Sequence, residues 1–493
     1  MTDKSPSLWR VKPVGALLAG KESSHLRRSL SVVDLVALGI GAIIGTGIFV
    51  VTGVAAAQYA GPGLVISFVL AGLAAALAAL VYAELASMIP VAGSAYTYTY
   101  AALGEFVAWV VGWNLMLAYL IASGAVAIGW GSYLVDLLRF FGVLLPAALV
   151  NGPGQGGVAN LPAMAVAFLV ALLIIRGTSH SARATKAIVL VKLAVIALFI
   201  VVGIRFVDPA NWRPFLPFGI LGIFQGAAIV FFAYIGFDAV ATAAEETKRP
   251  QRALPKGILG SLIVSTVLYI VVTLVLTGLV PYVQLNTASP VTTALLRAGV
   301  PLAGGIVAVG ALAGITSVLV VILYAQSRIF FAMSRDGLLP PVFSRLHPRY
   351  RTPYIATLIV GAVVMLIGGF MPFQTVAELA NIGALMTFML TAVGVMVLRR
   401  TRPDLPRPFK TPGVPWTPVL SILFSAYLAG NLPADTWLRY AIWMAAGIIV
   451  YFAYGYRHSA LAPRDTRFSW RSLLAPVHAK PFHRPNRAGQ DKR

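Results

Sequence analysis

The sequence predicts an all-α integral membrane protein with twelve transmembrane helices, arranged as two five-helix repeats followed by two further helices. Three observations lead to this prediction. The composition is 59% hydrophobic and only 11% charged, whereas a soluble domain is about 45–50% apolar and about 25% charged. Apolar stretches long enough to span a bilayer recur along the chain. Two of these stretches are interrupted by glycine at corresponding places in the two halves.

The composition also limits the function classes. Cysteine is absent from the 493 residues, which excludes a disulfide framework and a thiolate metal site. The six histidines fall in predicted loops or tails and form no metal-binding pair on a helix, so we expect no metal and no other cofactor. The net charge of +22 could suggest nucleic acid, but basic loops on one side of a membrane explain it, and no nucleic-acid fold signature is present.

Each predicted span holds about 20 mostly apolar residues. The twelve spans are 31–58, 62–86, 104–128, 161–177, 186–205, 221–244, 257–280, 301–330, 354–372, 377–398, 414–430 and 437–456. We expect no cleavable signal peptide, because the first thirty residues are basic and polar. The predicted organisation is an N-terminal segment at 1–30, a core at 31–400, helices 11 and 12 within 401–457, and a basic tail at 458–493. The polar, proline-containing composition of the tail predicts disorder.

The positive charges predict the orientation. With the N-terminus in the cytoplasm, 32 of the 38 lysines and arginines fall in inner loops and tails, and five fall outside. One more, Lys192, lies within a span. Because inner loops of membrane proteins are enriched in lysine and arginine, we expect both termini to be cytoplasmic and the protein to lie in the cell inner membrane.

An internal repeat relates residues 31–205 to residues 221–400. Adding 191 to the start of a span in the first repeat lands near the matching span of the second, and Gly45 and Gly236 lie the same 191 residues apart. Because each repeat has an odd number of spans, the second repeat should be inverted in the membrane relative to the first.

The first interrupted stretch, GIGAIIGTGIF, covers residues 39–49 and has four glycines within nine residues. Each glycine costs about 1 kcal/mol in a helix interior relative to alanine. A helix break at membrane depth frees backbone groups, so it is tolerated only where it lines a cavity or meets a ligand. The half-helix that begins after the break presents free N–H groups, which suit an anion such as a carboxylate.

The second interrupted stretch, FFAYIGFDAV, covers residues 231–240 and contains Gly236 and the acid Asp238. One glycine run alone would more often indicate close helix packing, but two in matching positions favour a transporter's substrate site. A carboxyl in a low-dielectric site is harder to ionise, so Asp238 is a candidate proton carrier. The alternative is a carboxylate that stays charged at the start of the next half-helix, and the sequence leaves both open.

Lys192 interrupts the apolar run AIVLVKLAVIALF in the fifth span. A lysine within a span is a functional candidate, although its stem could also extend to the membrane interface. We favour the functional interpretation. A fixed ammonium could replace a bound sodium ion by bridging the first span to the hydroxyls of Thr316 and Ser317.

Four other acids lie near span ends. Glu84 and Glu105 flank the loop after the second span, and Glu245 and Glu246 end the sixth span close to several basic residues. For the last two, we expect a solvated or salt-bridged loop rather than a site.

These stretches resemble the amino acid–polyamine–organocation (APC) superfamily of transporters, and within it bacterial permeases similar to the cationic amino acid transporter family. The matching blocks are GIGAIIGTGIFVVTG at 39–53, PVAGSAYTYTYAALGE at 90–105, FFAYIGFDAVATAAEETKRPQRALP at 231–255 and SRDGLLP at 334–340. The similarity runs from about residue 30 to residue 458.

The resemblance implies a LeuT-like five-plus-five fold with helices 1 and 6 unwound, and proton-coupled uptake of an α-amino acid. It places the substrate carboxylate on the amides of Thr46 and Gly47, and the ammonium on backbone carbonyls. It makes Phe232 an aromatic gate and gives Lys192 the place where sodium-driven relatives hold an ion. The implied substrate site comprises Ile43, Gly45, Thr46, Gly47, Phe232, Ala233, Ile235 and Ile322. The implied coupling group comprises Lys192, Asp238, Thr316 and Ser317.

Two features bear on the substrate. Ile322 matches a pocket position in the family, and its large apolar side chain suggests a small or medium neutral L-amino acid. The third span reads GWNLMLAY, with Asn114 and Ala118 where relatives commonly carry acids. This departure weakens the case for a cationic substrate and leaves the coupling role of those acids in doubt.

The leading hypothesis is therefore a secondary active amino acid transporter that imports its substrate with protons. The alternatives are an exchanger, a cationic amino acid or polyamine transporter, and, in a different class, a membrane amino acid sensor. An enzyme is disfavoured, because the spans contain no histidine, cysteine or acidic pair. The expected partners are an amino acid, protons and the lipid bilayer, without nucleic acid. The sequence leaves open whether a small single-span subunit attaches.

Overall fold

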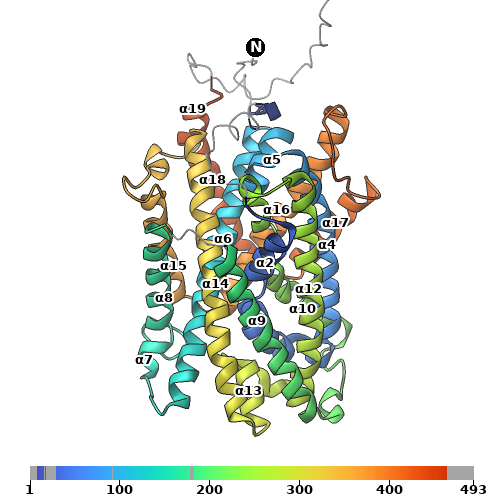
Figure 1. The fold of residues 1–493 in the computed structure, drawn as a ribbon, viewed down its shortest axis with the longest axis vertical. Coiled ribbons are helices and arrows are strands. Elements are labelled where there is room, and N and C mark those ends of the chain that lie inside the picture. The colour runs from blue at the N-terminus through green and yellow to red at the C-terminus, as the bar shows by residue number, and fades with distance from the viewer. Residues whose placement is uncertain (1–7, 16, 18–28, 92, 178–181, 463–493) are drawn as a thin grey trace, which may run out of the picture.

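A computed structural model describes residues 8–15, 17, 29–91, 93–177 and 182–462. These residues form an elongated bundle of helices (Figure 1). Residues 8–12, α5 and α19 lie together at one end of the bundle, which we call the terminal face. Apart from its first residues, the predicted basic tail lies outside the described residues.

The helices follow one another along nearly the whole described chain. They are α2 (Val32–Ile43), η1 (Gly47–Val51), α3 (Thr52–Ala55), η2 (Ala56–Ala60), η3 (Gly61–Gly63), α4 (Leu64–Met88), α5 (Ser94–Ala102), α6 (Glu105–Phe140), α7 (Ala147–Val150), α8 (Leu161–Ile175), α9 (Ala182–Gly203), η4 (Ile204–Phe206), η5 (Pro209–Trp212), α10 (Gly219–Val230), η6 (Phe231–Tyr234), α11 (Ala239–Thr242), η7 (Ala244–Glu246), α12 (Pro250–Leu279), η8 (Tyr282–Leu285), α13 (Pro290–Arg297), α14 (Pro301–Arg335), η9 (Pro341–Ser344), α15 (Tyr354–Phe370), α16 (Phe373–Thr401), α17 (Trp416–Gly430), α18 (Ala434–Val450), η10 (Tyr451–Gly455) and α19 (Tyr456–His458).

Within the described residues, eight helical stretches are long and apolar enough to cross a membrane, and four shorter apolar helices, α2, α8, α15 and α17, accompany them. Every predicted span overlaps these segments, although the first span is divided between α2 and the stretch Gly47–Met88, which also contains the second span. The all-helical membrane class is therefore confirmed. The count of twelve crossings and the inverted relation of the two repeats stay predictions.

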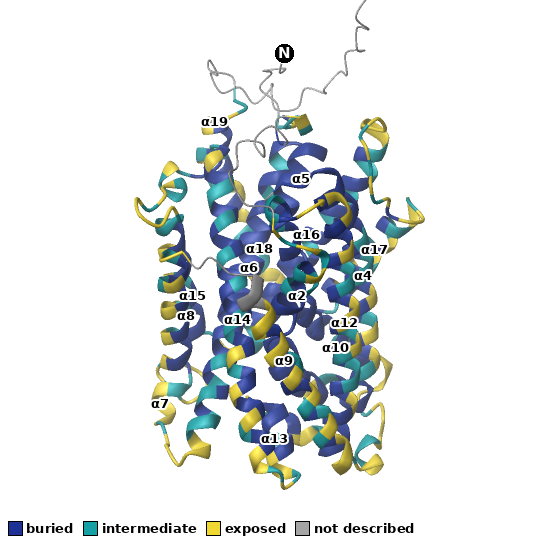
Figure 2. Cartoon of the chain, in the orientation of Figure 1, coloured by how far each residue is buried: buried dark blue, intermediate teal, exposed yellow. Residues whose placement is uncertain are grey.

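Burial separates the centre of the bundle from its periphery. Figure 2 shows α6 largely buried in the middle, while the outer faces of α8 and α9 carry exposed residues. Large apolar side chains such as Leu169, Leu190 and Leu302 are more than half exposed. A contiguous apolar exterior of this kind is typical of a surface that contacts lipid.

Both predicted helix breaks are present. The first lies at Ile44, which is extended (φ −77°, ψ 105°) between α2 and the helical stretch that resumes at Gly47. The second follows η6, where Ile235 is extended (φ −60°, ψ 129°) and Gly236 has a φ of +119°. Only glycine adopts that φ readily, which explains its place in the second break.

The first glycine run contributes packing as well as a break. Gly39 and Gly41 stay inside α2, so the helix is interrupted only in the second half of the run. A Cβ on Gly39 would collide with Ser261 of α12, and one on Gly41 would lie 3.3 Å from Val189 of α9. These two glycines therefore permit close helix packing, the alternative that the sequence left open for a single run.

Glu84 anchors the terminal end of α4. Its buried carboxylate accepts hydrogen bonds from Arg399 Nε (3.0 Å) and Nη2 (2.7 Å), and from the amide of Thr411 (2.7 Å). Arg399 lies at the end of α16, and Thr411 lies in the loop before α17. A carboxylate that the sequence placed beside a loop therefore joins three distant segments.

Replacing this carboxylate should destabilise the fold. We expect Glu84→Ala to lower the free energy of unfolding by about 2–3 kcal/mol, because Arg399 and the Thr411 amide lose a buried acceptor. The thermal unfolding midpoint in detergent measures the change. Asp435→Ala is the matched control: Asp435 is highly exposed and lies 3.9 Å from Arg439, so its removal should have little effect. Equal midpoints for the two variants would contradict this assignment.

Candidate functional site

A small cavity of about 10 Å³ lies between the two breaks. The residues that line it are Ala42, Ile43, Gly45, Thr46, Gly47, Ala122, Val126, Phe232, Ile235, Val318 and Ile322. All predicted substrate-site residues except Ala233 are among them. Such a volume is close to the least that holds one water molecule, so a larger ligand requires the surrounding side chains to move.

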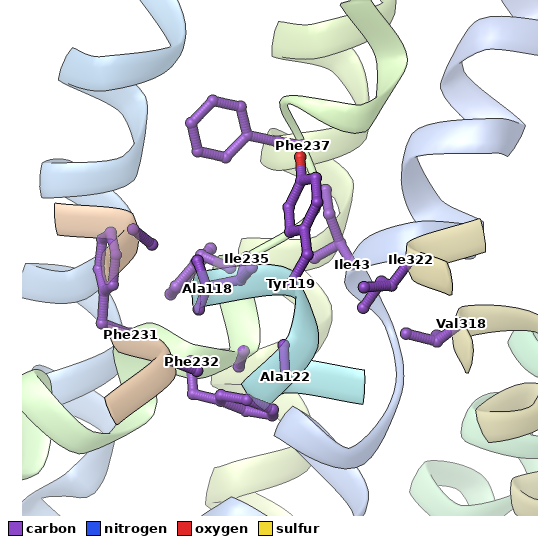
Figure 3. Close-up of a cluster of buried hydrophobic side chains, with 14 of the residues drawn as sticks. Ile43, Ala118, Tyr119, Ala122, Phe231, Phe232, Ile235, Phe237, Val318 and Ile322 are labelled. Carbon is purple, nitrogen blue, oxygen red and sulfur yellow. The ribbon is translucent and has the colours of Figure 1, made fainter. Parts of the chain in front are cut away.

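The walls of the cavity come from two unbroken helices. Ala122 of α6 faces the cavity from one side, and Val318 and Ile322 of α14 face it from another (Figure 3). Val126 of α6 also lines it. Of these four, only Ile322 was singled out from the sequence. The others are ordinary apolar residues within apolar spans, so nothing in their local pattern marks them as lining a site.

The polar groups at the cavity belong mainly to the first break. Because the helical stretch resumes only at Gly47, the amides of residues 45–47 have no partner one helical turn earlier. The hydroxyl of Thr46 is buried and has no hydrogen-bond partner among the described residues. A cluster of free N–H groups at the start of a helical stretch attracts an anionic group.

The two breaks are in direct contact. A Cβ on Gly47 would collide with the backbone of Ala233, which places Ala233 behind the cavity wall rather than at its surface. The hydroxyl of Tyr269 on α12 lies 2.9 Å from the Ile43 carbonyl and 2.8 Å from the Ala233 carbonyl. A tyrosine hydroxyl has a single proton to donate. Tyr269 therefore lies between the two breaks and donates to one of the two carbonyls at a time.

A second side chain supports the other break. Asn381 of α16 donates through Nδ2 to the carbonyls of Ala228 (2.8 Å) and Ile229 (3.2 Å), at the end of α10. Sequence analysis missed both Tyr269 and Asn381. A lone polar residue in an apolar span was the only available signal, and it does not say which distant carbonyl the residue meets.

The aromatic residues of the second break differ in their surroundings. Phe232 lines the cavity (Figure 3) and meets Phe373 of α16 edge to face, with ring centroids 6.4 Å apart. Phe231 packs against Phe388 instead. Tyr234 donates to the Phe68 carbonyl at 2.8 Å. Of these three residues, only Phe232 lines the cavity.

Lys192 is fully buried and does not extend to the membrane interface. Its Nζ donates to the carbonyls of Gly41 (2.9 Å) and Ile44 (2.8 Å). These carbonyls lie at the C-terminal end of α2, where the helix dipole favours a cation. The predicted link from Lys192 to the first span is therefore formed.

The predicted link from Lys192 to α14 is not formed through hydroxyls. Thr316 accepts from Trp130 Nε1 (2.9 Å) and donates to the Leu312 carbonyl, while Ser317 donates to the Gly314 carbonyl (2.8 Å). Within the described part of the chain, neither hydroxyl bonds the lysine. Lys192 instead packs against Gly314, where a Cβ would lie 3.0 Å from the lysine Cγ. Helical hydroxyls readily bond their own preceding carbonyls, which explains the error.

Asp238 lies in the second break but outside the cavity wall. Its carboxylate is buried and accepts a hydrogen bond of 2.5 Å from the hydroxyl of Tyr119 on α6. It makes no side-chain capping bond to α11, and no ion pair to it is formed among the described residues. Tyr119 is a further residue that the sequence did not reveal.

Asn114 and Ala118, the two uncharged residues singled out in the third predicted span, make contacts that involve no charged group. Asn114 accepts from the Tyr440 hydroxyl of α18 at 2.9 Å, and Ala118 packs against Gly383 of α16. The residues that line the cavity include no charged side chain. The arrangement can therefore bind a small molecule through main-chain dipoles and apolar contacts.

Comparisons with known proteins identify the family of the chain. The family described as amino acid permease matches residues 30–454. The chain is 50% identical over 457 residues to the methylthioribose transporter of Bacillus subtilis (strain 168), covering 92% of this chain and 99% of the relative. It is 48% identical over 461 residues to the branched-chain amino acid permease BcaP of the same organism, covering 92% of this chain and 99% of that permease. It is 41% identical over 410 residues to the vacuolar cationic amino acid transporter 4 of Arabidopsis thaliana, covering 81% of this chain and 68% of that transporter.

The role of Lys192 at the first break can be tested through stability. We expect Lys192→Met to lower the free energy of unfolding by on the order of 2 kcal/mol, because two buried carbonyls lose their donor. Thermal unfolding in detergent reports the change. Lys186→Met on the same helix is the control, since that lysine is half exposed in its ion pair with Asp34. A Lys192→Met protein as stable as the control would show that the break does not depend on the ammonium.

Proposed function

We propose that this chain, which belongs to the amino acid permease family, is a secondary active transporter that takes up a neutral L-amino acid with an aliphatic side chain together with protons. One observation carries the proposal: the cavity between the two breaks combines free main-chain groups with apolar side-chain walls. Main-chain groups suit the charged ends that all α-amino acids share, and apolar walls suit an aliphatic side chain.

The first break would hold the zwitterion. The free amides near Thr46 and Gly47 are placed for the carboxylate, and carbonyls such as that of Ile43 are placed for the ammonium. The Ile43 carbonyl already meets Tyr269, but a carbonyl oxygen can accept two hydrogen bonds. The Thr46 hydroxyl is buried without a hydrogen-bond partner among the described residues, and it would donate a hydrogen bond to the carboxylate.

The walls would select the side chain. A cationic amino acid or a polyamine would bring a charge into a cavity whose lining has no carboxylate, and burial of an unpaired charge is strongly unfavourable. The 48% identity to a branched-chain amino acid permease supports an aliphatic substrate.

A second candidate substrate follows from the 50% identity to a methylthioribose transporter. A sugar thioether has no carboxylate and no ammonium, so its hydroxyls would have to bond the same main-chain groups. The cavity lining offers one side-chain hydroxyl, that of Thr46. An amino acid uses the free amides and carbonyls more fully, and we therefore rank it first.

Proton coupling is proposed from two buried groups near the breaks. Asp238 has a neutral hydrogen-bond donor in Tyr119, and a buried carboxyl of this kind can exchange a proton without losing a salt bridge. The Lys192 ammonium occupies the end of α2 as a bound cation would. The charge asymmetry of the loops supports a location in the cell inner membrane with both termini in the cytoplasm.

Ligand-dependent stability tests the substrate proposal. Leucine, isoleucine or valine should raise the thermal unfolding midpoint, with about 2.7 kcal/mol of stabilisation at a hundred times the Kd. Lysine and putrescine should leave it unchanged. Stabilisation by methylthioribose alone would contradict the amino acid assignment and favour the second candidate.

In Ile322→Ser the preference should move to bulkier amino acids, and an unaltered ligand profile would remove Ile322 from the pocket.

The coupling proposal is tested in proteoliposomes. We expect Asp238→Asn to abolish accumulation driven by an inward proton gradient, because an amide cannot carry the proton, while exchange of internal for external substrate continues. Glu378→Gln is the matched control, since Glu378 is a buried acid on α16 whose hydrogen bonds go to Gln374 and Thr436 rather than to residues of the breaks. Uptake that requires sodium and ignores the proton gradient would refute the coupling scheme.

A further inference from the structure

Four buried polar atoms gather around Asp238 and the neighbouring ends of α4 and α5. They are Asp238 Oδ1 and the hydroxyls of Tyr82, Tyr98 and Ser94, and none of them has a hydrogen-bond partner among the described residues. All four residues are at most 2% exposed. Leaving such a group unpaired in a protein interior is unfavourable, so four in one place require a physical explanation.

Contacts between rings bring these groups together. The Tyr82 ring of α4 meets the Tyr98 ring of α5 edge to face, with centroids 6.3 Å apart. It also meets the ring of Phe237, the residue before Asp238, at 5.6 Å. Both tyrosines lie close enough to Asp238 to interact with it electrostatically, and Tyr82 also approaches Ser94. We call Tyr82, Tyr98 and Ser94 the hydroxyl cluster.

The carboxylate of Asp238 is held on one oxygen only. Oδ2 accepts the hydrogen bond from Tyr119 of α6, and the other titratable groups that face Asp238 are Tyr82 and Tyr98. α2, α12 and α14 also pack against α11, but within the part of the chain that the structure describes they provide no ion-pair partner for the carboxylate. Oδ1 is therefore left for a further hydrogen bond.

The hydroxyl cluster connects the second break with the terminal face. Ser94 is the first residue of α5, and α5 lies at that face (Figure 1). The preceding residue, Gly93, is partly exposed. Tyr98 lies one helical turn after Ser94, on the same face of α5. The cluster therefore runs from a buried carboxylate to within one residue of the protein surface.

Groups of this kind can conduct a proton. A hydroxyl oxygen can accept one proton while its own O–H bond breaks, and a water molecule held between buried polar groups can do the same. The carboxylic acid of Asp238 would give its proton to the first oxygen and become a carboxylate, and the last oxygen would release a proton to water. One O–H bond forms for each that breaks, so every hydroxyl returns to its neutral form.

We propose that Tyr82, Tyr98 and Ser94, bridged by water molecules, form the route by which the proton on Asp238 is exchanged with the cytoplasm. The inference rests on the proposed proton-coupled uptake. Substrate and proton then use different groups: main-chain groups of the first break hold the substrate, and side-chain hydroxyls of α4 and α5 conduct the proton. Net uptake needs this route in every cycle, because the empty carrier must return without its proton. Exchange of internal for external substrate does not, because the carrier can keep its proton.

Removal of single hydroxyls tests the route. Tyr98→Phe and Tyr82→Phe keep the aromatic ring and delete only the oxygen. In proteoliposomes, we expect each variant to slow uptake driven by an inward proton gradient at least about tenfold, because a positioned proton-transfer group speeds its step by a factor of on the order of a hundred or more. Exchange at equal pH on both sides should keep the parent rate. In Tyr98→Phe, the slowed uptake should show a larger solvent deuterium isotope effect than in the parent protein.

Tyr440→Phe is the matched control, because its hydroxyl donates to Asn114 rather than to the hydroxyl cluster. This variant should leave both rates unchanged. Equal losses of uptake and exchange in the two cluster variants, without a larger isotope effect, would indicate a structural role and overturn the proposal. Unchanged uptake in both cluster variants would overturn it as well. Because the two variants are independent, the second decides if the first does not fold.

Asp238→Asn separates failure of the route from failure of the coupling scheme. If Asp238→Asn abolishes uptake driven by the proton gradient while Tyr82→Phe and Tyr98→Phe behave as the parent protein, the proton carrier stands and the route is wrong. If Asp238→Asn retains this uptake, the coupling scheme itself is wrong, and the route is overturned with it.

Discussion

The structure depends on one constraint: backbone groups freed inside a membrane-spanning bundle must find partners. Two helices stop at the same depth, and neither water nor a continuing helix is available to them. Three neighbouring helices each send in one polar side chain. Lys192 of α9 binds carbonyls at the end of α2, Tyr269 of α12 lies between the breaks, and Asn381 of α16 holds the end of α10. Several of these carbonyls are thus satisfied by the protein, while the amides of residues 45–47 have no partner one helical turn earlier.

This division explains how recognition can be shared between main chain and side chains. The breaks supply dipoles that do not depend on side-chain identity, so they suit any molecule with a carboxylate and an ammonium. The walls come from α6 and α14, which are continuous helices. Substitutions on those helices can change the shape of the cavity without disturbing the breaks.

The terminal face is held together by charged side chains rather than by polar groups of the main chain. Its buried acids Glu84 and Glu105 are paired with arginines from distant segments, Arg399 and Arg10. Such pairs bring little net stability because both ions are desolvated, but breaking one leaves an uncompensated charge. They therefore specify which segments meet. Charges are concentrated at this end and absent from the cavity lining, so the positions of loops are set separately from the ligand site.

The amino-acid sequence by itself determined the membrane class, the approximate span positions and both breaks. These follow from local properties of the chain. Apolar runs are long enough to span a bilayer, and glycines destabilise a helix or adopt a positive φ within a few residues of the break. Tertiary structure decided which glycines pack and which break, that Lys192 binds carbonyls rather than the Thr316 and Ser317 hydroxyls, and that Tyr119, Tyr269 and Asn381 belong to the site. It also decided the docking of residues 8–12. Each of these is a contact between residues far apart in the chain, and such pairings depend on how helices pack against one another rather than on any local pattern.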